Sequence, residues 1–330
     1  MYNTFPPQAA PDPHSHSHQH TRLAHTSHSV SYPSIASVSM FQVASHPSSF
    51  ATHGHGHHHS HHSSSHHSSA HGSHGVNLPR TLQRPQFYDI PSRNITAVAP
   101  DLAGVPIEYV RRGLYPRARE MIGGISTLNV PSTMPANHLP KHLNVGCRAT
   151  PGVSYPTHLL AVCASKSGDA HAKLVPTHAL VLAAHCAHVE PLDAAAPQPG
   201  GSVLPLRIVR MAVPSPAAFP ILHAYMYNHR ADAVAQALFP ALPAGAARAF
   251  ATHQGITVAL GSGQAKHQLA AQLMQAEGGN LSRLTADAAH VKEAWQDMVS
   301  LGMYDAQLWD TIDLCWEVVL AALNLAAAQQ

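Results

Sequence analysis

The sequence predicts a mixed α+β protein, in which a long disordered tail precedes a core of short strands flanked by helices and a C-terminal helical layer. Three observations lead to this prediction. Residues 1–75 of the 330-residue chain contain only two charged side chains and 18 of the 30 histidines. Apolar or alternating stretches at residues 157–164 and 204–213 are typical of strands. From residue 264 onward, apolar residues recur at intervals of three and four, as in amphipathic helices.

The tail, residues 1–75, has the composition of a disordered segment, because Ser, Pro, Gly, Ala and His offer too little apolar surface to offset the entropy lost on ordering. Its densest part, residues 53–74, suggests metal binding or a pH response, since neutral imidazoles bind zinc or nickel and become charged at low pH. A low-complexity expansion without a defined site is the favoured alternative, because the spacing is irregular. The candidate metal ligands are His53, His55, His57, His58, His59, His61, His62, His66 and His67.

Three further segments follow the tail. Residues 76–104 contain repeated prolines that block helix formation, so we expect a linker there. Residues 105–245 are predicted to form the α+β domain, and residues 246–330 a C-terminal helical region.

The N-terminal part of the predicted domain contains a helix and a loop before its first strand. The helix covers residues 105–122 and is expected to break at Pro116. Residues 134–156 are predicted to form a loop. The next stretch, THLLAVCA at residues 157–164, is apolar enough for a strand that is buried on both faces.

A strand, helix, strand, helix order occupies residues 174–239, at the centre of the predicted domain. Thr177 is predicted to cap the first helix, and Ser215, which a proline follows, to cap the second. The second helix carries Phe219 on its apolar face, so we predict that this ring is buried at the centre of the domain. Pro220 is a candidate for a kink in the same helix.

Three helices are predicted in the C-terminal region. The first covers residues 264–276 and ends at a pair of glycines, and the second runs from about residue 286 to Gly302. Asp305 is predicted to cap the third. All tryptophans of the chain lie in the last two helices, as Trp295, Trp309 and Trp316.

The sequences PTHALVLAAHC, residues 176–186, and VPSPAAFPILHAYMY, residues 213–227, resemble the clampless-type sexual-development proteins of mushroom and smut fungi. The resemblance extends over residues 155–240 and 294–323. The order of elements around these motifs also resembles the core of the BTB/POZ domain. This resemblance implies a BTB/POZ-like core and a regulator of mating-dependent growth in a basidiomycete. It further implies a location in the nucleus, alone or together with the cytoplasm, and protein partners such as the mating-type homeodomain factors.

The sequence contains no recognisable catalytic motif, so we predict a non-enzymatic protein without cofactors. Residues 261–266 lack the spacing of a phosphate-binding loop. The strongest cluster of potential metal ligands lies in one predicted helix and comprises His178, His185, Cys186 and His188. For this cluster, a hydrogen-bonded structural role is favoured over a zinc site completed by His223 or His229.

The candidate partner-binding surface is the polar side of the last helix, where Asp310, Asp313 and Glu317 lie at intervals of three and four. A solvated helix face is the simpler interpretation of this acidic strip. The alternative is a docking strip for a basic partner. The family resemblance supplies homeodomain proteins as candidates, because homeodomains are strongly basic.

Composition limits the remaining functions. The formal net charge of +2 argues against direct binding to nucleic acid or to an anionic membrane. No apolar run is long enough to span a bilayer, and four scattered cysteines fit a reducing compartment. Two other functions stay open: a substrate adaptor of a cullin ubiquitin ligase, and a metal-buffering protein that uses the histidine tail. No oligomeric state is predicted.

Overall fold

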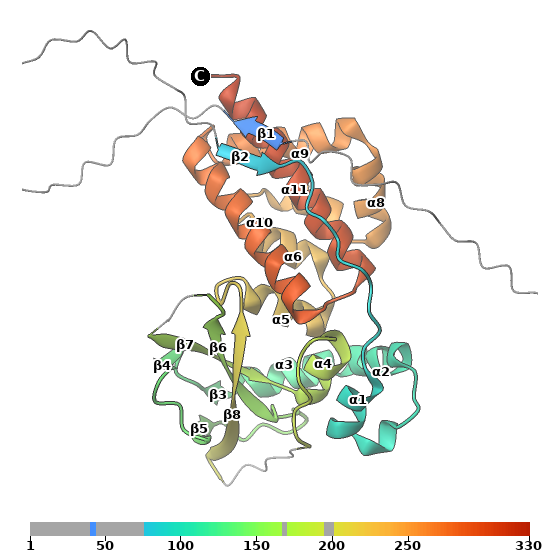
Figure 1. The fold of residues 1–330 in the computed structure, drawn as a ribbon, viewed down its shortest axis with the longest axis vertical. Coiled ribbons are helices and arrows are strands. Elements are labelled where there is room, and N and C mark those ends of the chain that lie inside the picture. The colour runs from blue at the N-terminus through green and yellow to red at the C-terminus, as the bar shows by residue number, and fades with distance from the viewer. Residues whose placement is uncertain (1–39, 44–75, 167–169, 195–200) are drawn as a thin grey trace, which may run out of the picture. The chain divides into compact units, whose positions relative to one another are not determined.

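The computed structural model describes residues 40–43, 76–166, 170–194 and 201–330 (Figure 1). A mixed sheet with short helices beside it precedes a layer of longer helices formed by the C-terminal part of the chain. The predicted α+β class is confirmed.

The larger sheet has six strands in the order β3-β5-β8-β6-β7-β4. Neighbouring strands are antiparallel, except that β6 and β8 run parallel. The strands are β3 (Leu128–Asn129), β4 (Thr133–Pro135), β5 (His142–Cys147), β6 (His158–Ala164), β7 (His171–Thr177) and β8 (Val203–Val213). Residues 158–163 of β6 are all buried, which confirms the prediction of a strand covered on both faces.

The two faces of the sheet belong to different clusters of buried side chains. Leu160 and Val162 of β6 point into the larger cluster, which is shared with the helices. Leu159 and Ala161 belong to a smaller cluster whose other members come from strands and from the loops beside them. The alternation follows from the two-residue period of a strand. One face is therefore covered by helices, whereas the other is buried mainly by the sheet itself.

The strand β5 corrects the prediction of a loop over residues 134–156. Leu143, Val145 and Cys147 alternate inward, while the outward positions between them hold Asn144 and Gly146. These two residues are uncommon in strands, which explains why the alternation was missed in the sequence.

The segment 76–104 is packed against the rest of the protein, so the prediction of a linker is wrong. It contains β2 (Val76–Pro79), α1 (Ser92–Val98) and a 3₁₀ turn, η1 (Pro100–Leu102). Leu82 and Ile95 are buried in the larger cluster. Proline does prevent long helices here, but an irregular chain can still bury apolar side chains.

The predicted break at Pro116 is confirmed. Two helices, α2 (Ile107–Leu114) and α3 (Ala118–Ser126), replace the single helix expected over residues 105–122. A 3₁₀ turn that contains the proline, η2 (Tyr115–Arg117), joins them.

The predicted strand, helix, strand, helix order is confirmed as β7, α4 (Ala179–His185), β8 and α5 (Phe219–Asn228). The predicted cap of α4 is wrong, because no side chain next to the helix caps it. Instead, the backbone N–H of Ala179 donates to Oγ1 of Thr157, 2.8 Å away at the start of β6. Thr177 lies within hydrogen-bond distance of the ring of His223.

The helix α5 begins later than predicted. Ser215 starts a turn in which its carbonyl accepts from the N–H of Phe219, the first residue of α5. Pro220 therefore lies in the first helical turn, where a proline removes no helical hydrogen bond. A proline at this position gives no reason for the predicted kink.

The C-terminal layer consists of α6 (Ala231–Leu238), α7 (Ala244–Ala247), η3 (Arg248–Phe250), α8 (His253–Gly261), α9 (Gly263–Ala276), α10 (Leu281–Leu301) and α11 (Ala306–Ala327). The predicted cap at Asp305 is confirmed, since its carboxylate accepts from the N–H of Leu308 at 2.9 Å. The helix α10 begins five residues before the expected position 286, at Leu281, with Asn280 as its cap.

Gly302 ends α10 as predicted, with a φ of 66°. The glycine is required for space as well, because a Cβ atom there would lie 2.8 Å from the ring of His188. At the same turn, the N–H groups of Ala187 and His188 donate to the carbonyls of Gly302 and Leu301. The segment that follows α4 is thereby joined to the C-terminal helices.

A small antiparallel pair of strands precedes the larger sheet. β1 (Met40–Val43) pairs with β2, so part of the tail that was predicted to be disordered contributes a strand. Residues 1–39 and 44–75 lie outside the described part of the chain.

Asp297 joins α10 to the turn before α5. Its Oδ1 accepts from the backbone N–H of Ser215 at 2.7 Å, and the hydroxyl of Ser215 donates to Glu293 at 2.8 Å. Asp297 is fully buried, and its Oδ2 has no hydrogen-bond partner among the described residues. Burial raises the pKa of Asp297 to about 7; the carboxylate of Glu293 adds to this rise, while the N–H of Ser215 opposes it.

We predict that Phe219→Ala lowers the free energy of unfolding by about 3–5 kcal/mol, because Phe219 is fully buried where α5 begins. The matched control is Ala224→Ser at an exposed position of the same helix, for which little change is expected. Urea unfolding of both variants provides the comparison. Equal effects would show that the helix faces are wrongly assigned.

We also predict a pH-dependent effect of Asp297→Asn. A carboxyl whose pKa is raised on folding contributes stability that is lost as the pH rises through the folded pKa. Relative to wild type, the variant should therefore gain about 1–3 kcal/mol of unfolding free energy between about pH 5 and pH 8. Urea unfolding at the two pH values measures this gain, and Asp101→Asn at an exposed site is the control. A difference independent of pH would contradict the assignment.

Candidate functional site

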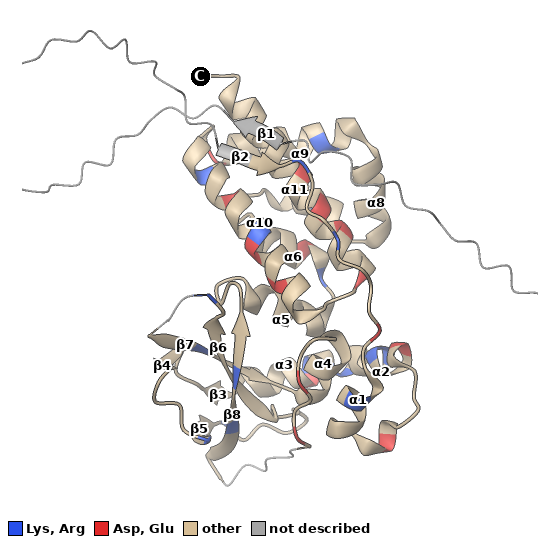
Figure 2. Cartoon of the chain, viewed as in Figure 1, with Lys and Arg blue, Asp and Glu red and all other residues tan. Residues whose placement is uncertain are grey.

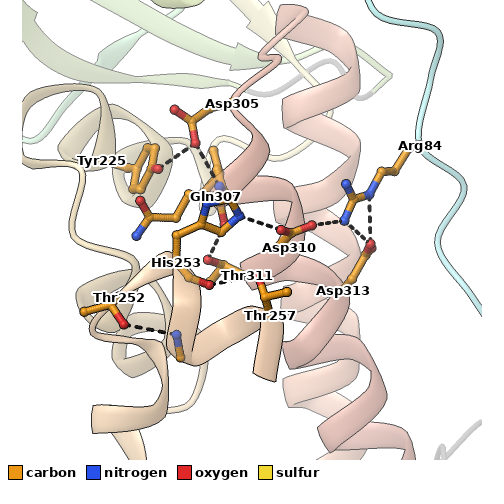
Figure 3. A network of polar contacts seen from close by, with 12 residues as sticks. Arg84, Tyr225, Thr252, His253, Thr257, Asp305, Gln307, Asp310, Thr311 and Asp313 are labelled. Carbon is orange, nitrogen blue, oxygen red and sulfur yellow. Dashed lines mark hydrogen bonds and ion pairs between the residues drawn. The ribbon is translucent and has the colours of Figure 1, made fainter. Parts of the chain in front are cut away.

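The carboxylates of the predicted acidic strip on α11 are paired within the chain. Figure 3 shows the pairs of Asp310 and Asp313. The guanidinium of Arg84 lies 2.5 Å from a carboxylate oxygen of Asp310 and 2.5 Å from one of Asp313. A second nitrogen of Arg84, Nε, donates to the same oxygen of Asp313 at 2.8 Å. One arginine thus holds two carboxylates that are three residues apart on the helix.

Two further side chains pair with the strip. Nε2 of His253, the first residue of α8, lies 2.7 Å from Oδ2 of Asp310. Nζ of Lys266 on α9 lies 2.6 Å from Glu317. The interpretation of this strip as a simple solvated face is therefore wrong. Partner binding by Asp310, Asp313 and Glu317 stays a prediction.

The pKa values of the two aspartates move in opposite directions. Burial alone raises the pKa of Asp310, but the hydrogen bonds from Arg84 and His253 outweigh it, and the pKa lies below its ordinary value. Asp313 is more strongly affected by burial and also faces Asp310 and Glu317, so its pKa is raised despite Arg84. The site is thus a compact group of negative charges that needs a cation.

Arg84 belongs to an extended segment, residues 79–84, which we call the strap. Leu82 of the strap is buried in the larger cluster. The indole N–H of Trp316 donates to the carbonyl of Pro79 at 3.1 Å, and that of Trp295 donates to the carbonyl of Gln83 at 3.1 Å. Figure 2 shows acidic positions along α11 next to the extended segment between β2 and α1. The strap is therefore fixed to α10 and α11 through backbone, apolar and charged contacts.

An aromatic cluster continues this contact beyond the strap. The ring of Phe87 lies 5.2 Å from that of Tyr304 in an edge arrangement. Tyr88 lies 5.9 Å from the ring of His188 and 6.0 Å from that of Tyr304. These distances are typical of aromatic pairs.

Sequence reasoning found the acidic strip but missed the cations that pair with it. Arg84 is separated from Asp313 by 229 positions, and Lys266 from Glu317 by 51. No local pattern links residues so far apart. One sequence signal is the indole N–H groups of Trp295 and Trp316. Such donors need acceptors where the ring is covered, and the strap supplies them.

The predicted histidine cluster has a structural role, which the hydrogen bonds of His178 show well. Its Nε2 lies 3.1 Å from the carbonyl of Ser154 and its Nδ1 lies 3.1 Å from the hydroxyl of Tyr227. Because a carbonyl only accepts, Nε2 carries the proton and Nδ1 accepts from Tyr227. Burial lowers the pKa of His178 to about 4, although the bond to Ser154 opposes this shift.

His185 of the cluster, and His223 beside it, are also hydrogen-bonded within the chain. Nδ1 of His185 lies 2.8 Å from the carbonyl of Val181, and its Nε2 lies 3.3 Å from Nε2 of His229. Burial lowers the pKa of His185 to about 4 and that of His223 to about 3. These side chains are consequently neutral at physiological pH.

In the described part of the chain, no three or more His, Cys, Asp or Glu side chains are placed so that they could hold a metal ion together. The nine candidate ligands between His53 and His67 lie outside it.

A cavity of about 300 Å³ lies between β8 and the segment after α4, lined by residues that include Glu190, Asp193 and Arg207. Arg207 and Asp193 form an ion pair there. A second cavity, of about 530 Å³, is lined by α2 and by His229 and Asp305. Both cavities combine cations with carboxylates, so neither selects a ligand of one charge.

We predict that the buried histidines make the protein sensitive to acid. A histidine whose pKa is lowered on folding contributes stability that is lost as the pH falls below its unfolded pKa of about 6.5. Between about pH 7.5 and pH 5, wild type should therefore lose about 2 kcal/mol at His223 that His223→Gln does not lose. The measurement is urea unfolding at both pH values, with His267→Gln on the exposed side of α9 as the control. The same loss in wild type and His223→Gln would contradict a neutral buried His223.

Within the described residues, no helix is both long enough and apolar enough to cross a membrane.

Comparison with known proteins identifies the family. The Clampless protein 1 N-terminal domain matches residues 85–214, and the Clampless protein 1 C-terminal domain matches residues 232–330. Neither the curated proteins nor the solved structures give a match, and the BTB/POZ-like core stays a prediction. The C-terminal match begins at residue 232, in α6, whereas the sequence prediction placed the domain boundary at residue 245. Since the two matches together cover more than half of the chain, the protein belongs to the clampless protein 1 family.

Proposed function

We propose that this chain is a non-enzymatic regulator of mating-type-dependent sexual development in a basidiomycete, and that it acts in the nucleus through protein partners. The observation that carries the proposal is the pair of family matches, which cover both the sheet region and the C-terminal helices. The family is named for the clampless proteins, and the resemblance of the core motifs points to the same developmental role.

The state of the reactive side chains supports a role without catalysis. Burial raises the pKa of the Cys186 and Cys315 thiols, so both are protonated at physiological pH and poor nucleophiles. Both ring nitrogens of His178 and of His185 are engaged within the chain. These groups therefore stabilise the fold and offer little for acid-base chemistry.

The charged site on α11 supports a basic protein as the partner. It already binds a guanidinium, and its two aspartates lie close together on a well-packed helix. Homeodomains are rich in arginine and lysine, so the mating-type homeodomain factors are the partners that fit best. The order β7-α4-β8-α5 favours a BTB/POZ-like core, which makes a cullin adaptor the second candidate.

The test is affinity purification of the tagged full-length chain from mating hyphae, followed by mass spectrometry. Homeodomain factors should be enriched over vegetative hyphae. Asp310→Asn combined with Asp313→Asn should lower their recovery by about tenfold, because charge-assisted contacts to arginine are lost. Glu108→Gln, at an exposed carboxylate on α2, is the matched control and should leave recovery unchanged.

Other outcomes would replace the proposal. Recovery of a cullin without homeodomain factors would favour the ubiquitin-ligase adaptor. Stoichiometric zinc in protein purified without added metal, together with no partner enriched in mating hyphae, would favour metal buffering by the histidine tail.

A further inference from the structure

The contacts of the strap are those of a bound peptide. Its backbone carbonyls at Pro79 and Gln83 each accept from an indole N–H, and these contacts recognise any extended chain. Two side chains add selectivity: Leu82, which is 6% exposed, and Arg84, which binds two carboxylates. In peptide recognition, backbone hydrogen bonds usually provide affinity and side-chain contacts provide specificity.

Apart from the buried Leu82, the strap lies largely at the surface. Residues 80–84 form no helix or strand, and the side chains of Thr81 and Gln83 are exposed. The strap precedes residue 85, where the family match begins, and yet it packs on helices of the C-terminal matched region. The strap and the helices on which it packs thus come from opposite ends of the described chain.

We propose that the surface of α10 and α11 beneath the strap is a peptide-binding site, that the strap is its resident occupant, and that an extended segment of a partner protein can replace the strap. The partner segment carries a leucine-like side chain two positions before an arginine, because Leu82 and Arg84 have this spacing. Trp295 and Trp316 hold its backbone. Asp310 and Asp313 hold its arginine.

Physical considerations favour exchange at this site. The strap is covalently attached, so its high effective concentration prevents weak ligands from binding to the surface of α10 and α11 beneath it. Its arginine is 42% exposed, and exposed ion pairs contribute little to stability individually. A partner with a better apolar anchor or a further basic residue near Glu317 can therefore compete. The site is then selective for strong, basic ligands.

The experiment uses the full-length protein and a fluorescent peptide with the sequence of residues 76–88, VNLPRTLQRPQFY. The strap is released by Leu82→Asp together with Arg84→Ala, and binding is measured by fluorescence anisotropy. The released variant should bind the peptide at least about tenfold more tightly than wild type, in which the strap occupies the site. Arg80→Ala, at an exposed arginine of the same strap, is the matched control and should behave as wild type.

Two further measurements locate the binding. Adding Asp310→Asn and Asp313→Asn to the released variant should reduce its affinity by about tenfold or more, and so should replacing the second arginine of the peptide with alanine. Raising the salt concentration should weaken binding, because the contact is charged.

The outcomes that overturn the proposal are distinct. Equal binding by wild type and released variant, or binding unaffected by the aspartate substitutions, would place the peptide elsewhere. Failure of the released variant to fold would show that the strap is a permanent part of the core. In that case Arg84→Ala alone, which keeps the buried Leu82, provides a second test. No gain in peptide binding by this variant would show that the strap does not exchange. The inference does not depend on the developmental role, because it is tested with purified components.

Discussion

The burial of α11 is the constraint on which the rest of the structure depends. This 22-residue helix has thirteen buried residues, among them Trp309 and Trp316. Helices α6, α8, α9 and α10 contact it, so the C-terminal layer is arranged around one long helix. A helix that is apolar on most sides is stable only when neighbours cover it. The few polar positions on α11 consequently lie where those neighbours meet, and side chains from three different segments pair with them.

The same constraint connects the two halves of the chain. The strap supplies acceptors for the indole groups of Trp295 and Trp316, while the turn at Gly302 binds the segment after α4. A third connection is Asp297, which accepts from Ser215. The segments that precede α5 are thus held to the C-terminal helices by specific polar contacts in addition to apolar packing.

The buried titratable groups have opposite effects on the pH dependence of folding stability. Neutral histidines at His178, His185 and His223 favour folding near neutral pH, whereas the raised pKa of Asp297 favours folding in acid. Each of these groups is buried because it completes a hydrogen bond to backbone or to a hydroxyl. Their role is to fix how elements pack, and the perturbed pKa values follow from this role. Perturbed values alone therefore do not mark a catalytic centre here.

The sequence by itself determined the α+β class, the strand buried on both faces, the order β7-α4-β8-α5, the caps at Asp305 and Gly302, and the family. These features depend on local periodicity, capping and motifs, which are encoded in neighbouring residues. Only the tertiary structure decided that residues 76–104 pack as part of the fold, that Thr157 takes the capping role expected of Thr177, and that Arg84, His253 and Lys266 pair with the carboxylates of α11. In each of these cases the partners are far apart in the chain, so their interaction depends on how the elements pack and leaves no periodic signal in the sequence.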